Sequence, residues 1–241
     1  LIEPIENAPK YLNSPETPLF AKSRILYAMN FARKAVQEED RVLVVEGYMD
    51  AVAAHQAGIG NVVATLGTSL TDEHVRLLGR YTRNILLSFD ADAAGVRAAL
   101  RAAEVIAAAG PEFSLRILTM PPGDDPDAML ARGEVAAFRR AMDTARTVAE
   151  FRLEALQSAH DLRDERGRIE FLREAVALLA EVASPLEEEA LLSRLAPFHP
   201  AFGTGGSRAE DSLRLEIRQQ RLARRGHSAP TAYADQPLGG Y

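Results

Sequence analysis

The chain has 241 residues, a hydrophobic content of 47% and no cysteine. This length is enough for one large domain or two small ones, and the lack of cysteine excludes a disulfide framework and a thiolate zinc site. The formal net charge of −6 does not indicate nucleic-acid binding, although carboxylates that hold metal ions count as negative until the metal binds. No apolar run could span a membrane and the first residues do not form a signal peptide, so we expect a cytoplasmic protein with no membrane partner. The lack of an initiating Met suggests an excised fragment.

The first 23 residues contain four prolines and predict an extended or looped segment rather than a helix. The string KYLNSPETPLFAKSR places Lys10 and Lys22 in this loop, where they either contact phosphate groups or are simply solvated. A helical period of apolar residues then predicts a helix over Ser23–Gln37.

The next apolar run, Val42–Val45, predicts a buried strand that leads directly into Glu46 and Gly47. Glycine at this point lets the backbone turn sharply and approach a ligand closely. A helix is predicted over Tyr48–Gly58. Asp50 in its first turn either serves a site or only interacts favourably with the positive end of the helix dipole.

Two further strands are predicted over Asn61–Leu66 and Ile85–Phe89. Between them a Gly-Thr-Ser turn precedes a helix that runs from Thr71, its predicted N-cap, to about Tyr81. The apolar Ile85–Phe89 run is typical of a strand that is buried on both faces of a parallel sheet.

The third strand ends on Asp90 and Asp92, and the alanine-rich residues after them predict a helix over Ala93–Ala109. This D-x-D pair admits two interpretations. Asp92 could only cap the helix while Asp90 forms a turn. Alternatively, both carboxylates could converge on one ion, because alternate residues of an extended segment point the same way.

A fourth strand, Ser114–Met120, leads into PPGDDPD, which carries Asp125 and Asp127 but could by itself be a simple turn. The β-α-β-α-β-α-β order predicts a parallel sheet with right-handed crossovers, and the carboxyl ends of its strands then lie on one edge. Clustered carboxylates repel one another unless cations neutralise them. The acidic residues after three of the four strands therefore predict an all-oxygen site for Mg²⁺ or Mn²⁺.

Beyond Met142, helical periods predict three helices at about Thr144–Ser158, Arg166–Val182 and Pro185–Leu195. Their shared apolar face is expected to form a core rather than a site: Val148, Phe151, Leu156, Ile169, Leu172, Val176, Leu179 and Leu191. From Phe202 onward, a Gly-rich entry and a Pro- and Gly-containing end predict a linker or disordered tail, within which residues 212–225 could form an arginine-rich helix.

Five strings in order resemble the bacterial replicative DNA primase family (DnaG): KYLNSPETPLF, EGYMDAVAAHQAGI, VATLGTSLT, FDADAAG and MPPGDDPD. The resemblance implies an α/β fold with a Toprim-type, mostly parallel sheet flanked by helices, followed by a small helical subdomain. The implied organisation has four parts. Residues 1–41 are the end of a basic amino-terminal subdomain with a linking helix, 42–142 the Toprim domain, 143–200 the helical subdomain and 201–241 a linker or disordered tail.

The same resemblance implies site residues by position. The catalytic, metal-binding carboxylates are implied to be Glu46, Asp90 and Asp92. Two further aspartates, Asp125 and Asp127, are implied to support the Mg²⁺ or Mn²⁺ site. The residues implied to contact nucleotide or template are Lys10, Asn13, Lys22 and Asp50.

The implied function is that of a primase, a DNA-dependent RNA polymerase. Its core makes short RNA primers on single-stranded DNA from ribonucleoside triphosphates, by metal-dependent nucleotidyl transfer. The replicative helicase is expected to bind through a region absent here, and zinc to belong to a module absent here. Two alternatives stay open. One is a Toprim nuclease that uses the same carboxylates, and the other is a metal- and nucleic-acid-binding fragment that is inactive without its missing domains.

Overall fold

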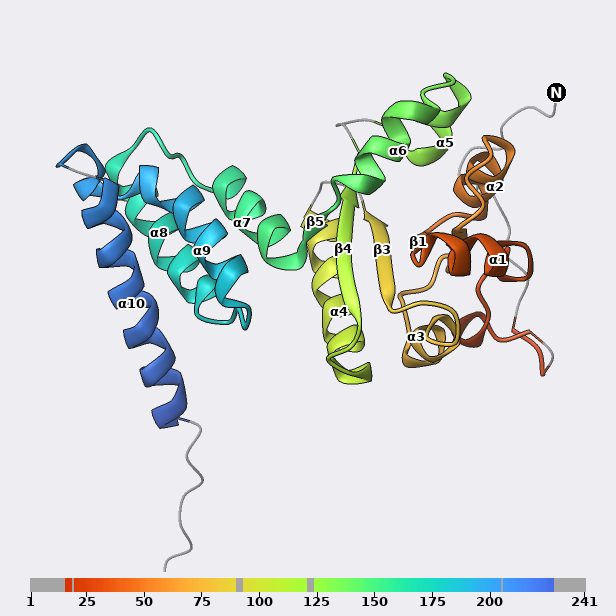
Figure 1. Cartoon of the computed structure of the whole chain (residues 1–241), viewed down its shortest axis with the longest axis horizontal. Helices are drawn as coiled ribbons and strands as arrows, with labels where there is room; N and C mark the ends of the chain where they lie inside the picture. Colours follow the sequence, from red (N-terminus) through yellow and green to blue (C-terminus); the bar gives the residue numbers. More distant parts are fainter. Residues whose placement is uncertain (1–15, 19, 90–92, 121–123, 205, 228–241) are drawn as a thin grey trace, which may run out of the picture. The chain divides into compact units, whose positions relative to one another are not determined.

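The computed structural model describes residues 16–18, 20–89, 93–120, 124–204 and 206–227, and Figure 1 shows the chain with its elements labelled. The chain divides into two compact units, Leu1–Val148 and Ala149–Tyr241, each with its own apolar core. This division falls a few residues after the predicted end of the Toprim domain. None of the described helices combines the length and the hydropathy that a membrane span requires.

The first unit is built on a five-stranded sheet with the order β2-β1-β3-β4-β5. The strands are β1 (Val42–Val45), β2 (Val62–Ala64), β3 (Asn84–Phe89), β4 (Ser114–Thr119) and β5 (Arg146–Thr147). The first four pair in parallel, which confirms the predicted mostly parallel sheet, and β5 adds an antiparallel edge. The edge strand was not predicted, because two residues carry no recognisable alternation.

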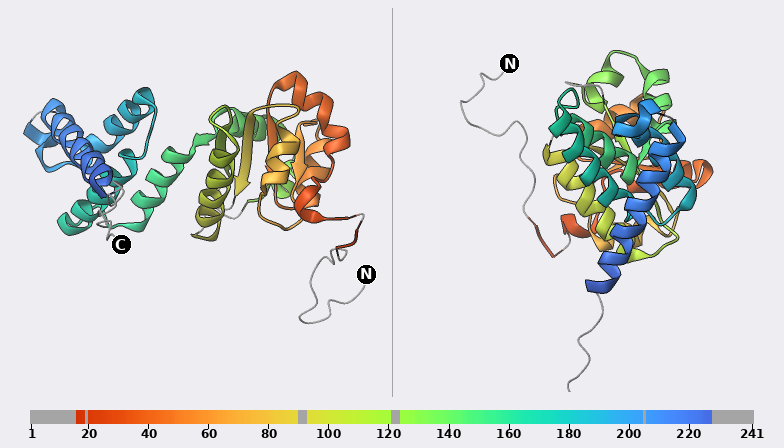
Figure 2. Two further views of the ribbon diagram at one scale, coloured as in Figure 1. Left: turned by 90° about the horizontal axis from the view of Figure 1, so that it is seen from below. Right: turned by 90° about the vertical axis from the view of Figure 1, so that its left-hand side faces the viewer.

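Helices cover both faces of this sheet. On one face, Leu43, Val45, Leu86 and Leu118 pack against residues of α2 (Tyr48–Gln56), α5 (Pro126–Ala131) and α6 (Val135–Asp143). On the other, α4 (Ala93–Ala109) runs along β3 and β4 and contacts α3 (Asp72–Leu78), as Figure 2 shows. All four β1 residues are buried, which explains their continuous β-branched and leucine composition.

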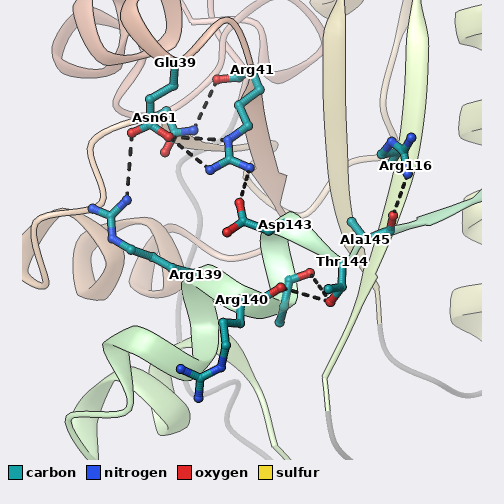
Figure 3. A network of polar contacts seen from close by, with 10 residues as sticks. Glu39, Arg41, Asn61, Arg116, Arg139, Arg140, Asp143, Thr144 and Ala145 are labelled. Carbon is teal, nitrogen blue, oxygen red and sulfur yellow. Dashed lines mark hydrogen bonds and ion pairs between the residues drawn. The ribbon is translucent and has the colours of Figure 1, made fainter.

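A polar network lies at the edge of the sheet where the parallel strands begin (Figure 3). The Arg41 guanidinium donates to Asp143 Oδ1 at 2.7 Å and to Glu39 Oε2 at 3.4 Å, and its backbone carbonyl accepts from Asn61 Nδ2 at 3.3 Å. These contacts tie the ends of α1 and α6 to the starts of β1 and β2. Since the ionic groups are partly exposed, each pair stabilises the unit by at most about 1 kcal/mol.

The helix predicted over Ser23–Gln37 begins later than expected. Lys22–Arg24 forms a 3₁₀ turn (η1), and α1 spans Met29–Glu39. Ala28 has φ 62°, in the left-handed region, and Tyr27 forms an isolated bridge with Ala64 at the end of β2. The prediction for residues 23–28 was wrong because the apolar period could not reveal this long-range backbone pairing.

The second unit is helical, with α7 (Val148–Ala159), α8 (Glu165–Leu179) and α9 (Pro185–Leu195) close to the predicted positions. Two 3₁₀ turns come next, η2 (Ala196–Phe198) and η3 (Pro200–Thr204), and then α10 (Gly206–His227). Most of the predicted core residues are buried or pack against the buried cluster, but Ile169 is exposed, so its assignment to the core was wrong.

The prediction that the chain from Phe202 onward is a linker or disordered tail was wrong for residues 206–227. They form α10, which lies beside α8 and α9 and buries Ala209, Leu213 and Ile217 in the core of the second unit (Figure 2). The three residues are four apart, so they share one face of a helix whose other faces are charged. Such a narrow apolar stripe is easily hidden in a segment that opens with several glycines. Residues 228–241 lie outside the described part of the chain.

A comparison of two leucines on α10 tests this packing. Leu213→Ala should lower the free energy of unfolding by about 2–5 kcal/mol, because the side chain is fully buried. Leu215→Ala, two residues away at a side chain that is 56% exposed, should change it by less than about 0.5 kcal/mol. Urea unfolding followed by circular dichroism measures both. Equal effects of the two substitutions would show that α10 is not packed.

Candidate active site at the carboxyl edge of the sheet

Glu46 is exposed directly after the last residue of β1. β1 pairs in parallel with β3 on one side, with Val44 opposite Leu87, and with β2 on the other. Asp90 is the next residue in the chain after Phe89, the last residue of β3. Asp90 and Asp92 themselves lie outside the described residues, so their contact with Glu46 stays a prediction. What the structure describes is that β3, which ends at Phe89, lies beside β1, and that both strands end at the same edge of the sheet.

A cavity of about 330 Å³ lies next to Glu46. The ends of β1 and β3, the loop after β2 and one face of α4 form its walls. Its polar lining consists of Glu46, Thr65, Thr68, Ser69, Ser88 and Arg101. An acid, four hydroxyl groups and a guanidinium in one recess can bind a polar, anionic ligand of small size.

The loop after β2 is folded against Glu46 by backbone hydrogen bonds. Thr65 N donates to Val45 O at 3.1 Å and Gly67 N donates to Glu46 O at 3.3 Å. Leu66 and Gly67 both have positive φ, 60° and 74°, which explains the glycine in this sharp turn. Thr68 Oγ1 donates to Thr65 O at 2.8 Å and closes the loop. The sequence showed this segment only as a turn, although a glycine followed by two hydroxyl residues at a strand end was a usable signal.

Asp50, Asp125 and Asp127 form a second acidic group where α2 meets α5. Asp125 caps α5 by accepting from Ala128 N at 2.6 Å, and Asp127 N donates to Asp50 Oδ1 at 3.3 Å. Burial raises the pKa of the Asp50 carboxyl above its usual value, and the negative charges of Asp125 and Asp127 raise it further, against the lowering effect of backbone N–H donors. A Cβ atom at Gly47 would lie 2.9 Å from Asp50 Oδ2, so a larger residue there would push the Asp50 carboxylate out of this position.

The donors at this edge are carboxylate oxygens, which suit Mg²⁺ or Mn²⁺ rather than zinc. Within the described ranges, no group of three or more Asp, Glu or His side chains has the spacing of a metal site. Among the described residues, Glu46 directly after β1 is the carboxylate predicted to be a ligand, with Asp125 and Asp127 in support, and this assignment stays a prediction.

Among the predicted nucleotide or template contacts, Lys10 and Asn13 lie outside the described residues, whereas Lys22 lies in η1. Its backbone carbonyl accepts from His74 Nε2 at 2.8 Å, and the carbonyl of Ser23 accepts from Thr71 Oγ1 at 2.6 Å. Thr71 and His74 also form a capping box at the start of α3, in which His74 Nδ1 accepts from Thr71 N at 3.3 Å. The fully buried His74 ring is therefore neutral and anchors the Lys22 segment. Nothing in the sequence indicated this role, because histidine occupies the place where a capping box normally has Glu or Gln.

Acidification should weaken the fold through His74. Burial lowers the pKa of its imidazole below the usual value, although the carbonyls of Lys22 and Ile25 favour the cation. As the pH falls through about 6.5, the unfolded chain takes up a proton that the folded chain does not, so stability is lost below that pH and restored above it. Melting temperatures of wild type should therefore fall more between pH 7.5 and 5.5 than those of His74→Asn, which does not titrate. Parallel pH profiles of the two proteins would contradict this assignment.

Comparison with known families identifies three segments of the chain. Residues 4–33 match the family described as the amino-terminal domain of the DNA primase catalytic core, and residues 43–130 match a Toprim-like family. Residues 149–196 match a family described as the DnaB-helicase binding domain of primase. The three segments have the same order as the predicted subdomains.

The chain belongs to the bacterial DNA primase family (DnaG). It is 37% identical over 190 residues to a DNA primase of Clostridium acetobutylicum, an alignment that covers 79% of this chain and 31% of that protein. The chain thus spans about a third of the length of this relative. The expectation was that the helicase contact lies in a region absent here. The match of residues 149–196 differs from it, because the matched family is described as a helicase-binding domain.

Solved structures of DnaG primases share the fold. A DnaG catalytic domain bound to single-stranded DNA is 38% identical, with a TM-score of 0.60 over 78% of this chain and 61% of that one. The RNA polymerase domain of Mycobacterium tuberculosis DnaG in complex with double-stranded DNA is 29% identical, with a TM-score of 0.67 over 82% and 63% of the two chains. Each match covers more of the chain than the first unit alone, so the similarity to DnaG catalytic cores extends beyond the sheet into the helices after it.

Proposed function

We propose that this DnaG chain is part of a primase core that makes RNA primers on a single-stranded DNA template from ribonucleoside triphosphates. The observation that carries the proposal is the parallel β1–β3 pairing, which puts the end of β1, before Glu46, and the end of β3, before Asp90, at one edge of the sheet. The adjoining cavity with Arg101 and four hydroxyl groups can receive the phosphates of a nucleotide. Relatives named DNA primase and a neighbour solved with single-stranded DNA support the same reaction.

Glu46, Asp90 and Asp92 would hold the divalent ion, with Asp125 and Asp127 in support. When bound, Mg²⁺ or Mn²⁺ supplies activation of the primer 3′-hydroxyl and neutralises charge on the pyrophosphate leaving group. The chain's own side chains position the reactants. Arg101 would donate to phosphate oxygens in the cavity, and His74 would hold the Lys22 segment in place through the Lys22 carbonyl.

Asp50 serves this proposal in a second way, besides the contact expected for it. It accepts from Asp127 N, so we propose that it also helps to position the start of α5 and the two aspartates there. Its expected contact with nucleotide or template stays a prediction. The remaining expected contacts, Lys10, Asn13 and Lys22, are proposed to bind template or nucleotide phosphate. The cytoplasmic location predicted from the sequence belongs to the same proposal.

A primer-synthesis assay separates the three functions considered. The chain is incubated with a single-stranded template, ribonucleoside triphosphates and Mg²⁺, beside a longer chain that carries the remaining primase domains. Short RNA products support the polymerase, whereas cleavage of the template supports a Toprim nuclease. DNA binding without either product supports a binding fragment that depends on its missing domains.

Replacing the carboxylate of β1 tests the proposed metal site. Glu46→Gln should lower Mn²⁺ affinity at least tenfold, because it exchanges a charged oxygen ligand for a neutral amide of the same size. It should also reduce primer synthesis to background in the longer chain. Electron paramagnetic resonance of free Mn²⁺ gives the affinity.

Glu104→Gln is the matched control, since this exposed carboxylate lies on α4 and no predicted site residue adjoins it in sequence. It should leave Mn²⁺ affinity unchanged. If Glu46→Gln binds Mn²⁺ as well as wild type does, Glu46 is not a ligand and the site assignment is wrong.

A second function is favoured by the family match of residues 149–196. We propose that the helical unit contacts the replicative helicase. Leu186 on α9 is 85% exposed, an unusual position for a leucine and a suitable contact for a protein partner. Leu186→Asp should weaken binding to a DnaB-type helicase about tenfold or more by calorimetry, whereas Leu222→Asp, at an exposed leucine outside the matched segment, should not. Unchanged affinity of the Leu186 variant would argue against a contact at α9.

A further inference from the structure

Two tyrosines from segments far apart in the chain meet next to Glu46. The rings of Tyr27 and Tyr48 have centroids 5.9 Å apart and an interplanar angle of 57°. Tyr27 belongs to the segment that matches the amino-terminal primase domain, and Tyr48 lies two residues after Glu46 in the Toprim-like segment. The ring pair therefore connects the two matched segments of the chain close to Glu46, at the carboxyl edge of the sheet.

Regular backbone structure holds both tyrosines in place. Tyr27 N donates to Ala64 O at 2.9 Å, and Ala64 N donates to Tyr27 O at 3.2 Å. Ala64 is in turn the sheet partner of Val45, the last residue of β1. Tyr48 is the first residue of α2, which begins directly after Gly47. Neither ring depends on a flexible loop, so the pair is organised before any ligand arrives.

Both rings keep part of their surface exposed, whereas aromatic rings that serve only core packing are buried. Tyr27 keeps 38% of its surface exposed, Tyr48 is partly exposed, and the adjacent Met49 is also exposed. An exposed tyrosine forgoes the free energy that burial of its ring would give. A fixed, accessible aromatic surface beside the candidate carboxylate can stack on a nucleobase. Because every base has a π-face, such stacking tolerates any sequence.

We propose that Tyr27, supported by Tyr48, is a platform on which one base of a single-stranded nucleic acid stacks beside Glu46. This inference rests on the proposed function, because it assumes that the chain holds a strand at the carboxyl edge of the sheet. Stacking there would fix one nucleotide of the strand relative to the reacting groups without reading its identity.

Abasic-site scanning tests the platform. Single abasic sites are moved one position at a time along a short single-stranded oligonucleotide whose register on the protein is set by a fixed duplex at its 3′ end. For the wild-type chain, one position should weaken binding about 5- to 150-fold, the range for loss of one stacked base. In Tyr27→Leu, an abasic site at this position should no longer weaken binding. Tyr27→Phe keeps the ring, so the loss of affinity at this position should remain.

Phe31→Leu is the matched control, because Phe31 is a highly exposed aromatic residue on α1 and should leave the penalty unchanged. Tyr48→Leu should reduce the penalty and provides a second variant should Tyr27→Leu fail to fold. A penalty that survives in Tyr27→Leu and Tyr48→Leu, or no penalty at any position of the wild type, would overturn the platform. Primer synthesis by wild type is measured separately, so the platform can fail while the proposed polymerase stands.

Discussion

The parallel hydrogen bonding of β1 to β3 is the constraint on which the rest of the first unit depends. It places β1 in the interior of the sheet, so its four residues are buried on both faces and must be apolar. It also requires crossover helices on the faces, which α2, α3 and α4 supply. Because neighbouring parallel strands end on the same side, the carboxyl ends of β1 and β3 lie at one edge of the sheet. The pairing of β1 with β3 therefore determines where the candidate active site lies.

A second feature of the unit is that its amino-terminal segment is joined to the sheet through main-chain atoms. Tyr27 exchanges two backbone hydrogen bonds with Ala64, and the carbonyls of Lys22 and Ser23 accept from His74 and Thr71. Each contact spans tens of residues in the sequence, so the segment depends on the completed sheet and α3 for its position. The two segments that match separate families thus belong to one compact unit.

Features that depend on local pattern could be predicted from the sequence. Continuous apolar runs indicated the four parallel strands. The acidic residues after three of these strands led to Glu46 as a site residue, which stays a prediction. Prediction failed where distant contacts decide the local structure. The left-handed Ala28 and the Tyr27–Ala64 bridge delay α1, and the buried Leu213 turns an apparently polar tail into a packed helix. The roles of His74 and of the loop after β2 could not be predicted either, because they depend on carbonyl groups that every residue possesses.

The anchoring of Lys22 through its carbonyl has a practical consequence. The fold does not use the Lys22 side chain for this contact, so the residue can be exchanged without releasing the segment. The chain also contains no cysteine. A cysteine introduced at this position would be the only thiol in this chain, and a fluorophore or spin label attached to it would report from a fixed point of the main chain. The native sequence thus already provides the background for distance measurements from the amino-terminal segment.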